Sequence, residues 1–69
     1  MLYEITPGVK HRSEEFGGVA DSFYYGTIIL NEDEYRLLLQ IESGKEIGEE
    51  HQEKVKEFLD VGLISLKND

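Results

Sequence analysis

In the first half of the chain, short stretches of β-branched, aromatic and other apolar residues are separated by glycine and polar residues, a pattern typical of strands joined by turns. The pattern predicts an extended lead-in over residues 1–8 and then three strands, over residues 9–13, 16–20 and 27–30. Polar and glycine positions in residues 21–26 predict the turn before the third strand. This half is therefore expected to form a β-hairpin that is extended by a third strand.

Two adjacent glycines, Gly17 and Gly18, lie inside the second predicted strand. Glycine in the interior of a strand indicates a bulge or a place where another backbone comes close. A phosphate-binding loop is not indicated, because the Gly-Lys-Ser/Thr sequence and the helix start that such a loop needs are missing.

Apolar positions after Asn31 take a helical spacing and predict a first helix over residues 32–43. Asn31 is expected to cap this helix, Glu34 completes a capping-box pattern, and Gly44 is expected to end the helix. Apolar residues cover more than half of its circumference, which predicts a central helix that contacts the sheet and other helices at once.

The second half continues with a short helix or turn over residues 45–49 and a last helix over residues 50–61. Gly62 is expected to end the last helix, and an extended apolar tail follows. The helical wheel places Val55 and Leu59 on its inner face, together with Gly62. One flank of the helix carries His51, Lys54, Phe58 and Val61.

The composition is that of one small globular domain, residues 1–69, with 39% hydrophobic and 32% charged residues. Seven basic residues against fifteen acidic ones give a net charge of −8, and the basic residues are scattered, which argues against nucleic acid and anionic membranes as partners. The chain has no cysteine, nothing that resembles a signal peptide and no apolar run long enough to cross a bilayer. A cytoplasmic protein is therefore expected.

Few residues are of the types that catalyse reactions or bind metal ions. The histidines, His11 and His51, are expected at the surface or on a flank, because they lack the spacing of a metal site. The serines lack a neighbouring base or a nucleophile elbow. Adjacent acidic residues fit solvated turns and helix N-termini. The sequence therefore predicts no catalytic residue, no metal ion and no cofactor, so a protein that is not an enzyme.

Three segments resemble the PqqD-like family: V-K-H-R-S-E-E-F-G-G-V at residues 9–19, T-I-I-L-N-E-D-E-Y at residues 27–35 and F-L-D-V-G-L-I at residues 58–64. The chain is most similar to the mycofactocin-associated branch, the MftB-like proteins, which carry a similar Arg-x-Glu-x-Phe-Gly-Gly pattern. The resemblance covers nearly the whole chain. It implies an α+β fold that is winged helix-turn-helix-like, with a three-stranded antiparallel sheet followed by three helices.

The family serves as a recognition element for ribosomally made, post-translationally modified peptides (RiPPs). The leader of a precursor peptide adds as an extra strand to the third strand, opposite the last helix, and is presented to a maturase, often a radical SAM enzyme. The resemblance thus implies a peptide chaperone without catalytic activity, in which Phe58 is the best candidate for an apolar pocket. The pairing of Lys54 with an acid of the leader is a hypothesis that rests on the helical wheel alone. The peptide-binding residues that the resemblance implies are Thr27, Ile28, Ile29, Leu30, His51, Lys54, Phe58 and Val61.

Two other classes remain open. A winged-helix regulator that binds nucleic acid would share the fold, but residues 49–60 carry five acidic residues against two lysines. A small protein-interaction module could instead form a homodimer through the edge of residues 27–30. The hairpin register is open as well, because a slip of one residue decides whether Ile28 or Ile29 faces the core.

Overall fold

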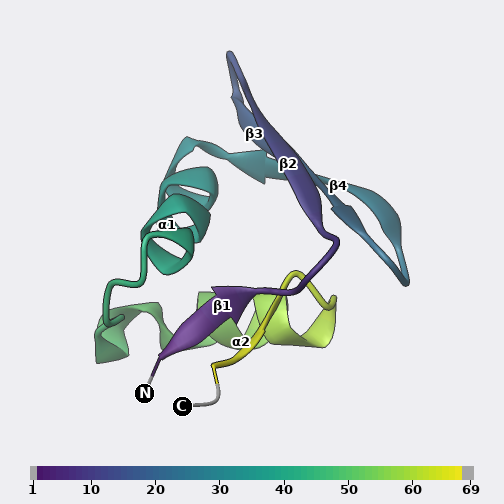
Figure 1. Ribbon diagram of the computed structural model, residues 1–69. Coiled ribbons are helices and arrows are strands. Elements are labelled where there is room, and N and C mark those ends of the chain that lie inside the picture. The colour runs from purple at the N-terminus through teal and green to yellow at the C-terminus, as the bar shows by residue number, and fades with distance from the viewer. Residues whose placement is uncertain (1, 68–69) are drawn as a thin grey trace.

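Two antiparallel sheets and two α-helices enclose one hydrophobic core (Figure 1). The computed structural model describes residues 2–67, so Met1 of the predicted lead-in and residues 68 and 69 of the predicted domain lie outside the described residues. The protein is of the α+β class, as predicted. The elements in chain order are β1 (Tyr3–Ile5), β2 (Lys10–Glu14), β3 (Gly17–Ser22), β4 (Gly26–Asn31), α1 (Glu32–Glu42), the 3-10 turn η1 (Glu49–His51), α2 (Gln52–Asp60) and β5 (Ile64–Leu66).

The larger sheet has the strand order β2-β3-β4, which confirms the predicted three-stranded antiparallel sheet and leaves β4 at an edge. Side chains alternate along β4, where Leu30 is 2% exposed and Ile29 is 72% exposed. Ile28 is partly buried and contacts the core. In the register that forms, Ile28 and Leu30 therefore face the core and Ile29 faces outward.

The glycine pair marks a close approach and not a bulge, because the β2-β3 ladder runs through both glycines without an extra residue. Gly17 has a φ of +145°, and a Cβ there would overlap the backbone of Asn31. A Cβ on Gly18 would overlap the ring of Tyr35. Helix α1 and the end of β4 can lie this close to β3 only because both positions lack a side chain.

Helix α1 begins with the predicted capping box. The Asn31 Oδ1 accepts a hydrogen bond of 2.8 Å from the Glu34 N–H, and the Asn31 N–H donates one of 2.8 Å to Glu34 Oε1. Gly44 follows the last turn with a φ of +84°, as expected for a left-handed position after a helix. The helix buries Tyr35, Leu37, Leu38 and Ile41, so it is central, as predicted.

The prediction of three helices is wrong. Residues 2–67 form two α-helices, because residues 45–48 are not helical and η1 is a single 3-10 turn that continues into α2. Gly44 and Gly48 leave three residues between them, which is too short a stretch to offset the cost of starting a helix. Ile47 fixes this connection, since its side chain is buried in the core.

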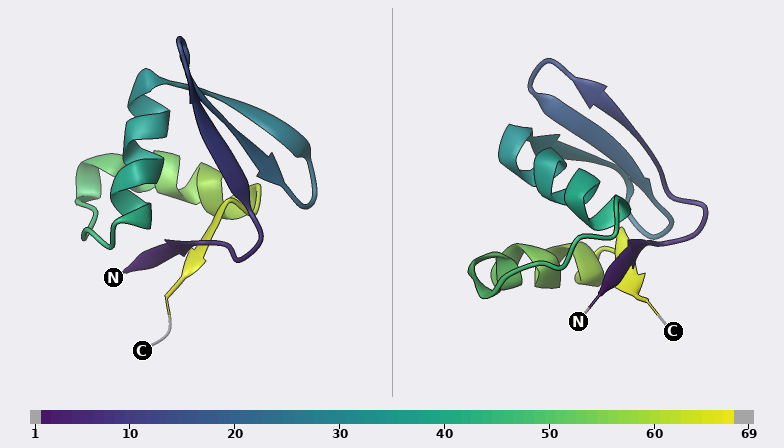
Figure 2. Two further views of the ribbon diagram at one scale, coloured as in Figure 1. Left: turned by 45° about the horizontal axis from the view of Figure 1, so that its top comes forward. Right: turned by 60° about the vertical axis from the view of Figure 1, so that its left-hand side comes forward.

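The predicted lead-in and the apolar tail pair with each other and form a second sheet, β1-β5, that the sequence did not predict. Tyr3 lies opposite Leu66, and Ile5 lies opposite Ile64. The two strands lie side by side in both views of Figure 2, where β1 is purple and β5 is yellow. The tail is thus a structural strand and not a loose end, with Leu63 and Ile64 fully or almost fully buried.

Both sheets and both helices contribute to a single cluster of buried side chains. No helix within residues 2–67 is long and apolar enough to span a membrane. The buried hydrophobic residues are Tyr3, Ala20, Leu30, Tyr35, Leu37, Leu38, Ile41, Ile47, Val55, Phe58, Leu63 and Ile64.

Candidate functional site

A groove lies between the edge strand β4 and helix α2. It has a volume of about 380 Å³. No strand pairs with β4 on the side away from β3 in the part of the chain that the structure describes. Its lining, which defines the β4–α2 groove, consists of Ile28, Ile29, Leu30, Glu34, Lys54, Glu57, Phe58, Asp60, Val61 and Leu63.

Of the four edge residues implied by the family resemblance, three line the groove and Thr27 does not. The Thr27 hydroxyl donates a hydrogen bond of 3.0 Å to Asp21 Oδ1 on the neighbouring strand. The side chain of Ile29 points to the outer face of the sheet, so this residue borders the groove through its main chain. Strand β4 therefore borders the groove with its main chain and with one half-buried side chain, that of Ile28.

On the helix side, Lys54, Phe58 and Val61 line the groove, whereas His51 does not. His51 lies one turn earlier, where it borders a different surface hollow together with Asp33 and Leu37 of α1. The structure thus brings together six of the eight residues expected to bind a peptide and leaves Thr27 and His51 outside the groove.

The inner face of α2 differs from the prediction. Val55 and Phe58 are buried, with exposed fractions of 1% and 3%, whereas Leu59 is 36% exposed. The helix turns Phe58 inward because the large ring removes more apolar surface from water than Leu59 does. Phe58 is therefore part of the core and forms the floor of the groove, in place of the flank position expected for it.

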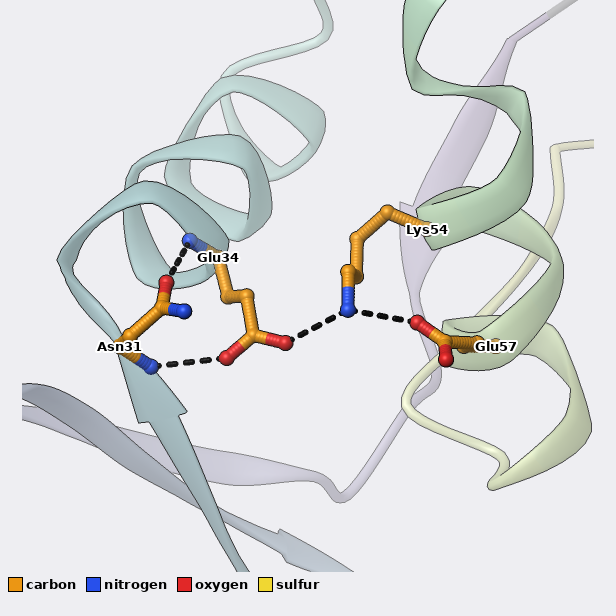
Figure 3. Close-up of polar contacts among 4 residues, drawn as sticks. All are labelled: Asn31, Glu34, Lys54 and Glu57. Atoms are coloured by element: carbon orange, nitrogen blue, oxygen red, sulfur yellow. Dashed lines mark hydrogen bonds and ion pairs between the residues drawn. The ribbon is translucent and has the colours of Figure 1, made fainter.

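An ionic chain in the lining of the groove joins α1 to α2 near the Asn31 end of β4 (Figure 3). The Nζ of Lys54 lies 2.7 Å from Glu34 Oε2 and 2.6 Å from Glu57 Oε2. Lys54 was expected to pair with an acid of a bound leader, but two carboxylates of the chain already hold it. A ligand acid would have to displace one of them.

The same contacts shift the pKa values of Glu34 and Lys54. The hydrogen bond from the Asn31 N–H, and then the one from Lys54, lower the pKa of the Glu34 carboxyl. The hydrogen bonds to Glu34 and then Glu57 raise the pKa of the Lys54 ammonium. Glu34 and Lys54 are therefore charged at neutral pH. Because Glu34 already accepts from the Asn31 N–H, the open part of the β4 edge ends at Leu30.

Beyond the groove, the end of α2 is joined to the turn between β3 and β4. The Ser22 hydroxyl, which is buried, donates a hydrogen bond of 2.6 Å to the Val61 carbonyl at the end of α2. It also accepts from the N–H groups of Tyr24 and Tyr25, at 3.1 and 3.3 Å. One side chain thus fixes the turn to the helix that forms the groove wall.

Sequence reasoning missed the acidic lining of the groove, Glu34, Glu57 and Asp60. The helical wheel contained a signal for two of them, because Glu57 and Asp60 follow Lys54 at intervals of three residues. Glu34 could not be found in this way, since it comes from a different helix, 20 residues earlier.

His11 is not the surface residue that was expected. Its Nδ1 lies 2.8 Å from the Tyr35 hydroxyl and its Nε2 lies 2.7 Å from Glu42 Oε2, so it joins β2 to both ends of α1. Burial, and then the charge of Glu42, raise the pKa of the Tyr35 phenol. A phenol that ionises less readily is not an activated nucleophile. The contact is therefore structural.

No group of three or more potential metal ligands occurs within residues 2–67. Comparisons with known protein families, with curated proteins and with solved structures found no match, so they assign no family to the chain. The function is therefore inferred from the geometry of the β4–α2 groove.

Proposed function

We propose that this protein is a non-catalytic peptide-binding chaperone of the PqqD-like kind, a RiPP recognition element with a winged helix-turn-helix-like fold. It captures the leader of a ribosomally made precursor peptide as an added strand on β4 and presents it to a maturase such as a radical SAM enzyme. The single observation that carries the proposal is the uncovered edge of β4, which borders a groove whose other wall is α2. Because precursor peptides are made by ribosomes, capture takes place in the cytoplasm.

Strand addition explains how such a site binds a peptide without a deep pocket. Main-chain hydrogen bonds to residues 27–30 supply affinity, and alternate side chains of the added strand supply specificity. One set of these side chains points into the groove, toward Ile28, Val61 and Phe58. The other set shares the outer face of the sheet with Ile29, which is exposed and lies opposite Val19 of β3.

The same uncovered edge also favours a second candidate, a small interaction module that forms a homodimer by pairing β4 with β4 of a second copy. No comparable observation favours a regulator that binds nucleic acid. Helix α2, which would enter a groove of DNA, carries the acidic side chains Glu57 and Asp60 on its surface.

The test is a titration of the isotope-labelled protein with the leader of the precursor peptide encoded nearest to its gene, followed by backbone amide shifts. Perturbations are expected in residues 27–30 and in α2. Shifts confined to other elements, or no shifts at saturating peptide, would contradict the proposal. A tight dimer at every concentration that ignores the leader would favour the homodimer.

A pair of variants on α2 makes the test specific to the groove. Val61 lines the groove and Leu59 does not, although both are partly exposed aliphatic residues near the end of the helix. We expect Val61→Ala to weaken leader binding by roughly three- to ten-fold, because it removes two methyl groups from the contact. Leu59→Ala should leave the affinity unchanged, and equal losses for both variants would point to a general effect on stability.

A further inference from the structure

The β4–α2 groove carries a net negative charge. Its lining contains three carboxylates, Glu34, Glu57 and Asp60, and one ammonium group, Lys54, which leaves a net charge of −2. Lys54 is fully engaged by Glu34 and Glu57 at the Asn31 end. One of the two unbalanced charges remains at the Asn31 end, where Glu34 and Glu57 share Lys54, and the other lies at Asp60, toward the opposite end.

Asp60 occupies a position that costs the fold stability. It is the last residue of α2, where the negative end of the helix dipole disfavours a carboxylate, and the last turn has no basic residue to offset it. Within residues 2–67 Asp60 has no hydrogen-bond or ion-pair partner. An exposed, unpaired acid at this place in the groove wall is suited to a cation that arrives from outside.

Aromatic side chains of the β3–β4 turn lie near the end of α2, outside the lining of the groove. Tyr24 contacts Gly62, two residues after Asp60, where a Cβ would lie 3.2 Å from the ring. Phe23, Tyr24 and Tyr25 are exposed by 64%, 81% and 65%, and Ser22 holds their turn against the end of α2. The faces of aromatic rings attract Lys and Arg side chains.

We infer that the segment captured on β4 is a cationic one, which places a Lys or Arg side chain between Asp60 and the aromatic turn of residues 23–25. This inference rests on the proposed function, strand addition to β4, and specifies the chemistry of the peptide. A second copy of the chain fits poorly at the same place, because it has a net charge of −8 and would set the two acidic grooves against each other.

The experiment uses three synthetic peptides with the same alternating Val/Thr stretch and with Arg, Gln or Glu at both of its ends. Each is titrated into the labelled full chain, and amide shifts give the site and the dissociation constant. We expect all three to perturb residues 27–30, with the Arg peptide binding roughly ten-fold more tightly than the Glu peptide at low ionic strength. The difference should shrink as salt is added.

Two variants assign the preference to Asp60. Asp60→Asn should lower the preference for Arg over Gln by roughly three- to five-fold. Its melting temperature should be unchanged or higher, because it removes a carboxylate from the negative end of α2. Glu53→Gln removes the same charge from the same helix outside the groove and should leave the preference unchanged.

The outcomes separate the two proposals. If no peptide perturbs residues 27–30, the edge does not accept strands and the proposed function fails. If all three peptides bind there with equal affinity, strand addition stands and the inference of a cationic segment is overturned. The assignment to Asp60 is overturned if Asp60→Asn and Glu53→Gln behave alike.

Discussion

At the scale of single residues, the Gly17–Gly18 pair shows how strictly one position can limit side-chain size. Gly18 lies against the ring of Tyr35, which leaves no room for a methyl group. The sequence alone allowed either a bulge or a close approach at this pair. It could not distinguish them, because the ring that fills the space belongs to a helix 17 residues later in the chain.

Gly18→Ala is expected to destabilise the protein by roughly 1–3 kcal/mol, since the added methyl group must push the Tyr35 ring and with it α1 away from β3. Urea unfolding measures the loss. The double variant Gly18→Ala, Tyr35→Ala should lose less than the sum of the two single variants, because the overlap disappears with the ring. Additive losses would contradict the steric explanation.

The Glu34 carboxylate predicts how stability changes with pH. Its pKa is lowered below the ordinary value of 4.5 in the folded protein, so its ionised form stabilises the fold above pH 4.5. This contribution is lost as the pH falls through the lowered pKa. The free energy of unfolding of the wild-type protein should therefore exceed that of Glu34→Gln at neutral pH, and the gap should narrow under acid conditions.

Urea unfolding at a series of pH values measures this difference. Glu53→Gln serves as the control, because it changes an exposed carboxylate on α2 that lies outside the ionic chain. A gap between wild type and Glu34→Gln that stays constant down to pH 2 would show that the charge of Glu34 does not contribute.

At the scale of elements, the β3–β4 hairpin and α2 act as one unit through Ser22. Its hydroxyl group makes three hydrogen bonds, to the Val61 carbonyl and to two N–H groups of the turn. The turn and its strands were predictable from the local sequence. The contact with α2 was not, because it joins residues 39 positions apart.

Ser22→Ala should cost about 1–3 kcal/mol, because it leaves the Val61 carbonyl and the N–H groups of Tyr24 and Tyr25 without this partner. Hydrogen exchange of the Tyr24 and Tyr25 amides should become faster, while the amides of α1 should respond only to the change in global stability. Ser13→Ala is the matched control, since Ser13 is exposed on β2. Slow exchange of both amides in Ser22→Ala would show that the turn is held by other contacts.

At the scale of the whole molecule, local signals predicted local structure and failed where distant segments meet. The capping box and the three-stranded sheet were predictable because their determinants lie within a few residues of each other. The β1-β5 sheet joins strands about 60 residues apart, as the pairing of Tyr3 with Leu66 shows, and no local sequence pattern predicts this pairing. The strand and the helix that border the groove were predictable from the sequence. The charge of the groove was not, because it depends on which side chains α1 and α2 bring together.

The pairing of β1 with β5 makes the tail part of the fold. Ile64→Ala is expected to cost about 2–5 kcal/mol, because the side chain is 2% exposed in the shared core. Leu66→Ala, two residues later on the same strand and 51% exposed, should cost less than about 1 kcal/mol. Thermal and urea unfolding of both variants measures the difference, and similar losses would contradict the central position of Ile64.

The β1-β5 sheet also determines how this fold can be connected to another protein chain. The Lys67 N–H donates a hydrogen bond of 3.1 Å to the Leu2 carbonyl, so the chain enters and leaves the fold on neighbouring strands. Neighbouring strands lie about 4.8 Å apart. A larger protein could therefore carry this fold as an insertion in one of its surface loops without stretching that loop, and the β3–β4 turn would point away from the junction (Figure 1).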